Sequence, residues 1–280
     1  GHQDFSEDTY RTLMAADSAV MVVDAAKGVE DQTRKLFHVC SLREMPIFTF
    51  INKMDREAQD PFQLLEDIES ELGIKTYPMN WPIGSGKEFK GVYDRKNERI
   101  IAFNGGNHGA TEVEAIEGSV DDERFREILG SALHDKLMED IELLDIAGDE
   151  FDVEKVRTGE LTPVFFGSAL TNFGVEPFLE NFLEMTTSPL PRQSNIGEID
   201  VFDENFSAFV FKIQANMNKA HRDRIAFMRI CSGKFQKGLE VFHMQGGKKV
   251  KLAQPQQFMA ENREIVEEAY AGDIIGVFDP

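Results

Sequence analysis

Asn52, Lys53 and Asp55 place three polar side chains in the segment INKMD (51–55), at the end of the apolar run PIFTFIN. An aspartate in this position can accept two parallel hydrogen bonds from the N1 and N2 hydrogens of guanine, and an asparagine amide can reach the imidazole side of the base. Adenine has an acceptor where guanine has a donor, so it would leave the carboxylate unpaired at a cost of about 10⁴-fold in affinity. The stem of Lys53 can lie along the face of the base. The spacing predicts a guanine site.

A second segment, GSAL (167–170), also ends an apolar run and precedes a helical pattern. The backbone N–H groups of Ala169 and Leu170 can point at the guanine O6 atom, while Ser168 braces the loop near Asp55. Either segment alone is a short match. Their order along the chain and their shared strand-to-loop context make the guanine hypothesis stronger than either segment does.

Both segments require a sheet whose strands end side by side. Over the first 190 residues apolar runs alternate with helical patterns, which favours a mostly parallel sheet covered by helices, and ligands bind at the carboxyl edge of such sheets. A helix is expected directly after NKMD, with Asp60 as N-cap, Pro61 in the first position and Gly73 at the end. We expect strands buried on both faces at AVMVVD (19–24), PIFTFIN (46–52), TYPMNWPI (76–83) and PVFFGSA (163–169).

A block inside this region interrupts the alternation, so we interpret it as an insertion. It has a predicted hairpin over 89–103, an acidic loop over 111–123 and a long helix from about 121 to 144. Short strands with glycine turns follow a proline-containing stretch and indicate a small antiparallel β-barrel. The predicted organisation is therefore a nucleotide domain at 1–190, a linker at 191–204 and a barrel at 205–280.

The chain resembles the translational GTPases in its first residues, GHQDF, and in VVDAAKGVEDQT (22–33). In that family Asp-x-Pro-Gly-His-x-Asp-Phe is followed by a strand ending in Val-Asp-Ala and by Gly-Val-Glu-x-Gln-Thr. HQDFSEDTYRTL, PIGSGKEFKGVYDR and HRDRIAFMRICSGKF are more similar to bacterial peptide chain release factor three than to elongation factor G. The resemblance covers the whole chain. It implies a P-loop-NTPase-like α/β GTP-binding (G) domain followed by the barrel called domain II.

The resemblance also implies a function, a ribosome-dependent GTPase that helps remove class-one release factors from the ribosome after termination. In the family the glycine matching Gly1 donates a backbone N–H to the γ-phosphate. The histidine matching His2 orients the attacking water once ribosomal RNA fixes its position, which makes His2 the implied catalytic residue. GTP and GDP are the implied substrate and product, and the ribosome, its RNA and class-one release factors are the implied partners.

Other sequence motifs of the translational GTPases have no match in this chain. GxxxxGK[ST] occurs nowhere, and GSGK (84–87) does not replace it, because Trp81 stands where the first glycine is needed and Glu88 where Ser or Thr is needed. An intact member uses Mg²⁺, whose expected ligands are absent here. We interpret the chain as a fragment that starts within the third nucleotide motif and lacks the third domain, and we expect weak GTP affinity and negligible hydrolysis by the chain alone.

The fragment hypothesis has a further consequence for the strand at 19–24. In the family another strand lies beside it, so a chain without that neighbour exposes an apolar edge that favours self-association. A stable monomer at high concentration in analytical ultracentrifugation would contradict this expectation.

Composition and charge limit the alternatives. The net charge of −20 taken over the whole chain argues against a nucleic-acid partner. However, residues 200–280 hold eleven Lys/Arg and eleven Asp/Glu, so the acidic excess lies before them and this argument does not apply to the second part of the chain. No apolar run has the 18 to 20 residues of a membrane span, so we expect a cytoplasmic protein. An equally open interpretation of the basic residues in this part is a solvated barrel surface of mixed charge. Those that could instead face phosphate are Lys219, His221, Arg222, Arg224, Arg229, Lys248, Lys249 and Lys251.

Two alternative functions remain open at this point. One is another translational GTPase of the elongation factor G kind. The other is a non-catalytic module that binds guanine or the ribosome and hydrolyses nothing. A phosphate loop encoded upstream in the gene would favour an enzyme, and its absence would favour the module.

Overall fold

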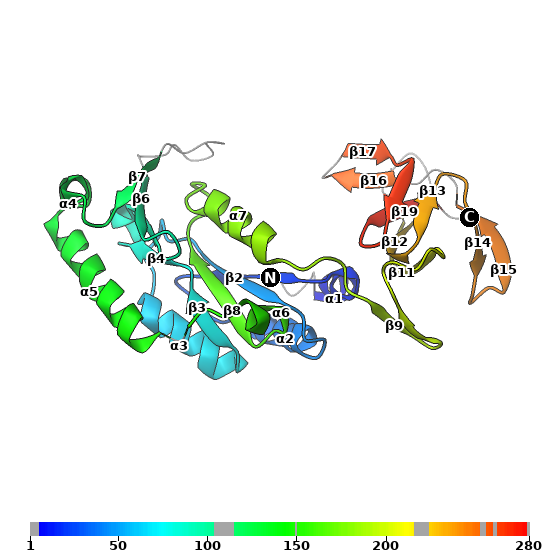
Figure 1. Ribbon diagram of the computed structural model, residues 1–280, viewed down its shortest axis with the longest axis horizontal. Coiled ribbons are helices and arrows are strands. Elements are labelled where there is room, and N and C mark those ends of the chain that lie inside the picture. Colours follow the sequence, from blue (N-terminus) through cyan, green and yellow to red (C-terminus); the bar gives the residue numbers. More distant parts are fainter. Residues whose placement is uncertain are drawn as a thin grey trace. The chain divides into compact units, whose positions relative to one another are not determined.

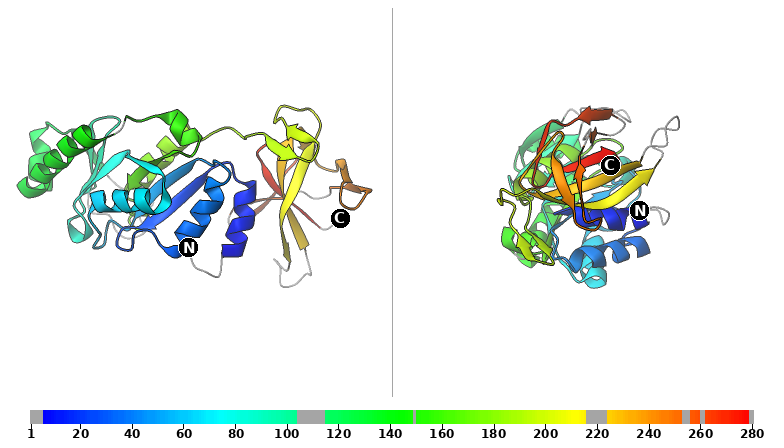
Figure 2. Two further views of the ribbon diagram at one scale, coloured as in Figure 1. Left: turned by 90° about the horizontal axis from the view of Figure 1, so that it is seen from below. Right: turned by 90° about the vertical axis from the view of Figure 1, so that its right-hand side faces the viewer.

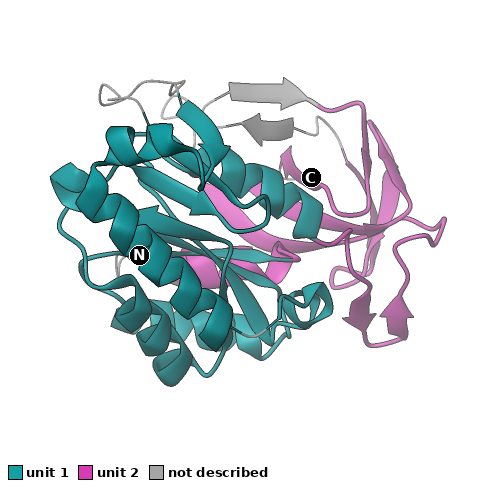
Figure 3. Cartoon of the chain, turned by 60° about the vertical axis from the view of Figure 1, so that its left-hand side comes forward, with its two compact units in different colours: residues 1–3, 18–186 teal, residues 4–17, 187–280 magenta. Residues whose placement is uncertain are grey.

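The computed structural model describes residues 6–103, 115–148, 150–215, 224–252, 256–259 and 262–278. The chain divides into two compact units (Figure 3). The first contains residues 1–3 and 18–186, and the second contains residues 4–17 and 187–280. Within the described residues, no helix is long and apolar enough to cross a membrane.

A parallel sheet forms the centre of the first unit (Figure 1). Its strand order is β1-β2-β8-β3, and every neighbouring pair in it is parallel. Because side chains alternate between the two faces, β2 and β8 contribute to two separate cores. The bounds are β1 Ala19–Asp24, β2 Ile47–Asn52, β3 Lys75–Pro78 and β8 Leu161–Phe166.

Helices cover both faces of this sheet (Figures 1 and 2). Leu64, Leu65 and Ile68 of α3 pack into one core, and Phe178 and Met185 of α7 pack into the other. The helix expected after NKMD is confirmed as α3, since the Asp60 side chain accepts hydrogen bonds from two backbone N–H groups of its first turn and Gly73 ends it at φ +70°. The bounds are α2 Asp31–Ser41, α3 Pro61–Leu72, α6 Val153–Arg157 and α7 Val175–Met185.

Strand β1 differs from expectation in its burial. We expected a strand buried on both faces, but Val20 is 43% exposed and Val22 is 56% exposed, whereas Val23 is buried. Among the described strands β1 pairs only with β2, and it therefore lies at an edge of the sheet. Self-association through this edge stays a prediction.

The inserted block forms a second sheet, antiparallel, with strand order β4-β5-β6-β7. The expected hairpin is confirmed as β5 and β6. Two expectations were wrong: the single strand at 76–83 divides at Met79 into β3 and β4, which belong to different sheets, and the acidic loop contains the strand β7. The bounds are β4 Asn80–Ile83, β5 Gly91–Asp94, β6 Arg99–Phe103 and β7 Ala115–Ser119.

The long helix expected at 121–144 is two helices, α4 Glu123–Leu129 and α5 Ser131–Ala147. Gly130 separates them at φ +84° and ψ 148°, a conformation that a helix does not contain and that L side chains rarely adopt. The apolar pattern of the sequence continues across Gly130, whereas the helix is interrupted there.

The second unit consists mainly of antiparallel strands, as expected from its glycine turns. Its five-stranded sheet has the order β11-β12-β19-β16-β17, and three two-stranded sheets accompany it. One of these, β9 with β10, lies inside the segment we expected to be a linker. The bounds are β9 Arg192–Ser194, β10 Gly197–Ile199, β11 Ser207–Ala215, β12 Arg224–Ser232, β13 Lys234–Gln236, β14 Glu240–His243, β15 Lys248–Lys251, β16 Gln256–Met259, β17 Asn262–Ile265, β18 Glu268–Tyr270 and β19 Ile274–Phe278.

Helix α1 (Ser6–Ala15) belongs to this second unit, although it comes first in the chain (Figure 3). Arg229 of β12 is only 2% exposed and donates to the carbonyl of Ala15 and to Asp17 Oδ2, the latter at 2.6 Å. Arg192 donates to Met14 O at 2.9 Å, so two arginines bind the carboxyl end of the helix. The hypothesis that Arg229 faces phosphate was wrong, because its guanidinium is buried against the protein's own carbonyl and carboxylate groups.

Candidate guanine-binding site

Three loops meet at the carboxyl edge of the parallel sheet, after β1, β2 and β8. Ala25 N donates to Asn52 O at 2.9 Å, which joins the first loop to the second. Met54 N donates to Gly167 O at 3.1 Å, which joins the second loop to the third. The segments INKMD and GSAL, far apart in sequence, are thus held side by side by their backbones.

Asp55 and Ser168 are in direct contact. Ser168 Oγ donates to Asp55 Oδ1 at 2.5 Å, and the serine is fully buried. Its loop is closed by two hydrogen bonds of 2.9 Å between the backbones of Ser168 and Phe173. Asp55 Oδ2 accepts no hydrogen bond from the described residues, and Oδ1 keeps a second lone pair. The carboxylate is therefore fixed in place with acceptor capacity left for a ligand.

Asn52 connects the two loops through its side chain. Its Oδ1 accepts from Lys53 N at 2.8 Å and from Ala169 N at 2.9 Å. Its Nδ2 donates to no described residue. Of the two N–H groups expected to face O6, that of Ala169 is bound to Asn52 here, while that of Leu170 has no partner among the described residues. The Leu170 side chain is 51% exposed, so this end of the loop faces solvent.

Lys53 reaches across to the loop after β1. Its backbone lies at φ +71°, and its Nζ atom is 2.6 Å from Asp24 Oδ2. Burial opposes ionisation of Asp24, but the hydrogen bonds from Lys53 Nζ and Ala26 N and the lysine charge hold the pKa of the carboxyl below its usual range. Asp24 entered the sequence analysis only as part of a family motif, and the structure shows that it directs the lysine.

The lowered pKa of Asp24 predicts a pH dependence of stability. A carboxyl whose pKa is lower in the folded than in the unfolded state stabilises the fold above its unfolded pKa, and this contribution is lost as the pH falls through the folded value. We expect Asp24→Asn to reduce the free energy of unfolding at pH 7 by less than about 1 kcal/mol, because Lys53 is 44% exposed and solvent screens the pair.

Urea unfolding of both proteins at pH 7 and pH 3 provides the measurement. The difference between them should shrink at pH 3, which lies below the ordinary pKa of an aspartate in the unfolded state, because part of the contribution is lost there. A difference that stays constant or grows with acid would show that Asp24 is not stabilised by its charge.

Two family models match the chain. The model of the family described as "Elongation factor Tu GTP binding domain" matches residues 1–188. The chain belongs to this GTP-binding domain family. A second model, "Elongation factor G domain 2", matches residues 205–280.

Curated relatives are similar to the chain over its whole length. "Peptide chain release factor 3" of Symbiobacterium thermophilum is 61% identical over 280 residues, which are 100% of this chain and 53% of that protein. The protein of the same name from Trichodesmium erythraeum is 54% identical over 100% of this chain and 52% of its own length. The chain thus spans about half the length of the curated relatives it matches.

A solved structure has the same fold. The crystal structure of the Thermus thermophilus protein ttk003000868 matches with a TM-score of 0.70 and 26% identity, covering 99% of this chain and 41% of that one. The expected fold class, a G domain with a parallel sheet and helices followed by antiparallel strands, is confirmed by this match and by the two family models.

Gly1 and His2, the implied γ-phosphate and water-positioning residues of the GTP-binding family, lie outside the described residues. The structure brings together the other six predicted site residues, which are Asn52, Lys53, Asp55, Ser168, Ala169 and Leu170. Within the described part of the chain, no group of three or more His, Cys, Asp or Glu side chains could hold a metal ion.

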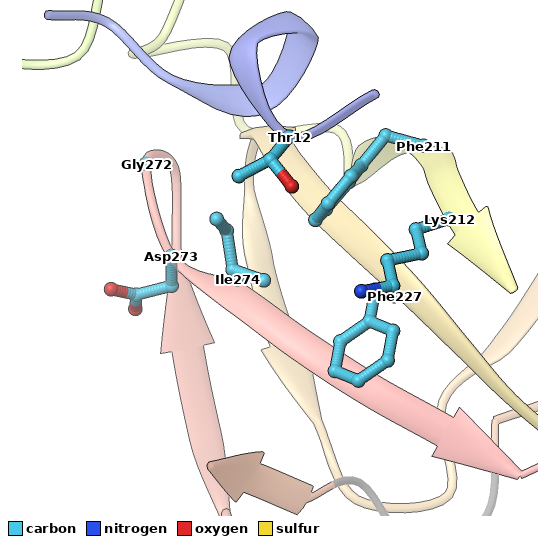
Figure 4. Close-up of a pocket in the computed structure, with 7 residues that line it drawn as sticks. All are labelled: Thr12, Phe211, Lys212, Phe227, Gly272, Asp273 and Ile274. Carbon is cyan, nitrogen blue, oxygen red and sulfur yellow. The ribbon is translucent and has the colours of Figure 1, made fainter. Parts of the chain in front are cut away.

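A cavity of about 530 Å³ lies in the second unit, between α1 and the strands β11, β12 and β19 (Figure 4). Thr12, Phe211, Phe227 and Asp273 are among its lining residues. The cation in it, Lys212, already binds Asp8 Oδ2 at 2.9 Å, which neutralises its charge. None of the predicted site residues that the structure describes lines this cavity.

Proposed function

We propose that this chain is the guanine-recognising part of a ribosome-dependent GTPase of translation termination, which promotes dissociation of class-one release factors from the ribosome in the cytoplasm. The observation that carries the proposal is the arrangement at the sheet edge. Asp55 is fixed by Ser168 with free acceptor capacity, and the neighbouring Asn52 Nδ2 and Leu170 N–H are donors without partners among the described residues. The relatives named "Peptide chain release factor 3" support the assignment to termination.

The three free groups match the edges of guanine. A carboxylate accepts from N1–H and from the 2-amino group, an amide nitrogen donates to N7, and a backbone N–H donates to O6. A purine that lacks one of these partners leaves a half-buried polar group unpaired, which is how a site rejects a close analogue strongly. Asn52, Lys53, Asp55, Ser168, Ala169 and Leu170 are the proposed base-binding residues.

Hydrolysis is proposed for the whole protein. The family assigns Gly1 to the γ-phosphate and His2 to the attacking water, and phosphoryl transfer depends on such positioning. Members of the family use Mg²⁺ with GTP. The described residues do not fit that ion, because they contain no cluster of metal-ligating side chains and the sequence contains no GxxxxGK[ST]. We therefore assign recognition of the base to the described site residues, and we assign no step of hydrolysis to a metal ion bound by them.

The proposed domain organisation is a G domain at 1–190, a linker at 191–204 and domain II at 205–280. We propose the ribosome as the partner of the domain II strands. The basic hairpin β14–β15 supports this, because Lys248 and Lys251 are exposed on one strand beside Lys249, which pairs with Glu240. Exposed lysines of this kind suit a phosphate backbone.

The experiment uses the complete product of the gene that encodes this chain. Competition binding should show that GDP displaces a fluorescent guanine nucleotide at least 100-fold better than ADP. With ribosomes carrying a class-one release factor, GTP should be hydrolysed and the factor released. Equal competition by ADP would refute the guanine site, and guanine-selective hydrolysis without factor release would restrict the function to a translational GTPase of another kind.

A further inference from the structure

Asn80 in the inserted sheet binds the last residue of the strand that leads into the GSAL loop. Its Nδ2 donates to Phe166 O at 3.1 Å, and its Oδ1 accepts from Phe166 N at 2.7 Å. The side chain is buried, with the residue 5% exposed. We infer that Asn80 is a positioning residue for guanine recognition, fixing the end of β8 from which the Gly167–Leu170 loop starts; this inference rests on the proposed function.

The location of Asn80 explains why a side chain is needed there. Strand β3 pairs with β8 up to Pro78 opposite Val164, and Met79 N then donates to Val164 O at 2.8 Å. After Met79 the chain leaves the parallel sheet and begins β4 of the inserted sheet. The backbone of Phe166 would therefore lose its neighbour on this side, one residue before the loop begins.

An asparagine amide resembles a peptide group in carrying one donor side and one acceptor side. Asn80 directs both its donor and its acceptor to Phe166. Its side chain therefore adds one more pair of hydrogen bonds to β8 where the pairing with β3 has ended. On its other side β8 is joined to β2, where Gly167 N donates to Ile51 O at 3.0 Å. The start of the GSAL loop is consequently held from both neighbouring strands.

The inserted sheet is itself anchored where it makes this contact. Trp81, next to Asn80, is fully buried, donates from Nε1 to Asp140 of α5 at 3.0 Å, and packs edge-on against Phe166 with ring centroids 5.5 Å apart. The insertion also reaches the other base loop, because Gly86 N donates to Met54 O at 2.8 Å. The insertion therefore braces both segments that form the proposed guanine site.

Ala169 and Leu170 belong to the braced loop itself, whereas Asp55 belongs to the INKMD segment and contacts the braced loop only through Ser168. Loss of the brace should therefore affect the O6 contact more than the contact to the 2-amino group. Two analogues separate these contacts. 6-Thioguanosine diphosphate keeps N1–H and the 2-amino group and replaces O6 by sulfur, a weaker acceptor, and inosine diphosphate keeps O6 and N1–H and lacks the 2-amino group.

The test compares dissociation constants for GDP and both analogues in the complete gene product and its variants. For Asn80→Ala we expect GDP binding about 10-fold weaker, and the preference for GDP over 6-thioguanosine diphosphate reduced about 3-fold. The preference for GDP over inosine diphosphate should change less. Asn80→Asp keeps the size and the acceptor but loses the donor to Phe166 O, and it should shift binding in the same direction if the alanine variant does not fold.

Thr162→Val is the matched control. Thr162 is a buried residue at the opposite end of the same strand, and its hydroxyl donates to Ile47 O at 2.7 Å. This variant should lower the melting temperature and leave both purine ratios at the wild-type values.

The outcomes separate this inference from the proposed function. If the wild type prefers guanine and Asn80→Ala keeps wild-type ratios while losing stability as Thr162→Val does, Asn80 has only a structural role and the inference is overturned. If the wild type shows no guanine preference, the proposed function is refuted, and the inference about Asn80, which depends on it, is refuted as well. A selective loss of discrimination at position 6 supports the inference.

Discussion

Asp55→Asn is expected to exchange the guanine preference of the site for a xanthine preference. The carboxylate of Asp55 offers two acceptors to the N1–H and 2-amino donors of guanine, while asparagine offers one acceptor and one donor. Xanthine has a carbonyl in place of the 2-amino group, so its edge matches the amide. The hydrogen bond from Ser168 to Oδ1 of the carboxylate can be kept by the amide oxygen, which leaves the loop in place.

The expected change in base preference is large because the carboxylate of Asp55 lies in a half-buried site. GDP should bind about 10²- to 10⁴-fold more weakly, and xanthosine diphosphate should become the better ligand. Calorimetric titration of the complete gene product with both nucleotides would measure this. Asp60→Asn provides a control in the same loop, because Asp60 only caps α3 and asparagine is an equally good N-cap. Unchanged GDP affinity in Asp55→Asn would remove Asp55 from the site.

Arg229→Met is expected to destabilise the second unit by about 3 kcal/mol, because it removes the buried guanidinium that binds both the carbonyl of Ala15 and Asp17, which then keeps Arg192 at 3.3 Å. For a unit of this size the melting temperature should fall by more than about 10 °C. Methionine fills much of the volume of the arginine stem, so the decrease in stability would come from the lost polar contacts rather than from a cavity.

Circular dichroism during thermal unfolding provides the measurement for Arg229→Met. Lys249→Met serves as the control, because its ion pair with Glu240 is exposed on both sides and should contribute little. A melting temperature equal to the wild-type value would mean that Arg229 does not hold the end of α1.

The sequence predicted those parts of the fold that depend on local chemistry. Asp60, Pro61 and Gly73 predicted both ends of α3 because a cap, a fixed φ and a left-handed residue act within a few residues. The contact between Asp55 and Ser168 followed from a general property of parallel sheets, in which loops after the carboxyl ends of strands meet. Both inferences needed no knowledge of distant packing.

The parts that were wrong depend on tertiary contacts or on one residue's backbone. The apolar pattern at 76–83 suits a strand in either sheet, and only the departure of the chain at Met79 separates β3 from β4. The basic character of Arg229 suggested phosphate, whereas its position on β12 places it against the end of α1. Asn80 had no sequence signal, because a buried asparagine that replaces a strand partner looks like any other asparagine.

The single tryptophan of the chain gives the first unit an optical signal that the second unit lacks. Trp81 is fully buried in the first unit, with an indole hydrogen bond to Asp140 and aromatic contacts to Phe62 and Phe166. Its fluorescence therefore follows the unfolding of that unit alone, whereas circular dichroism follows both units. Different midpoints for the two signals would show, without any label, that the two units unfold in separate steps.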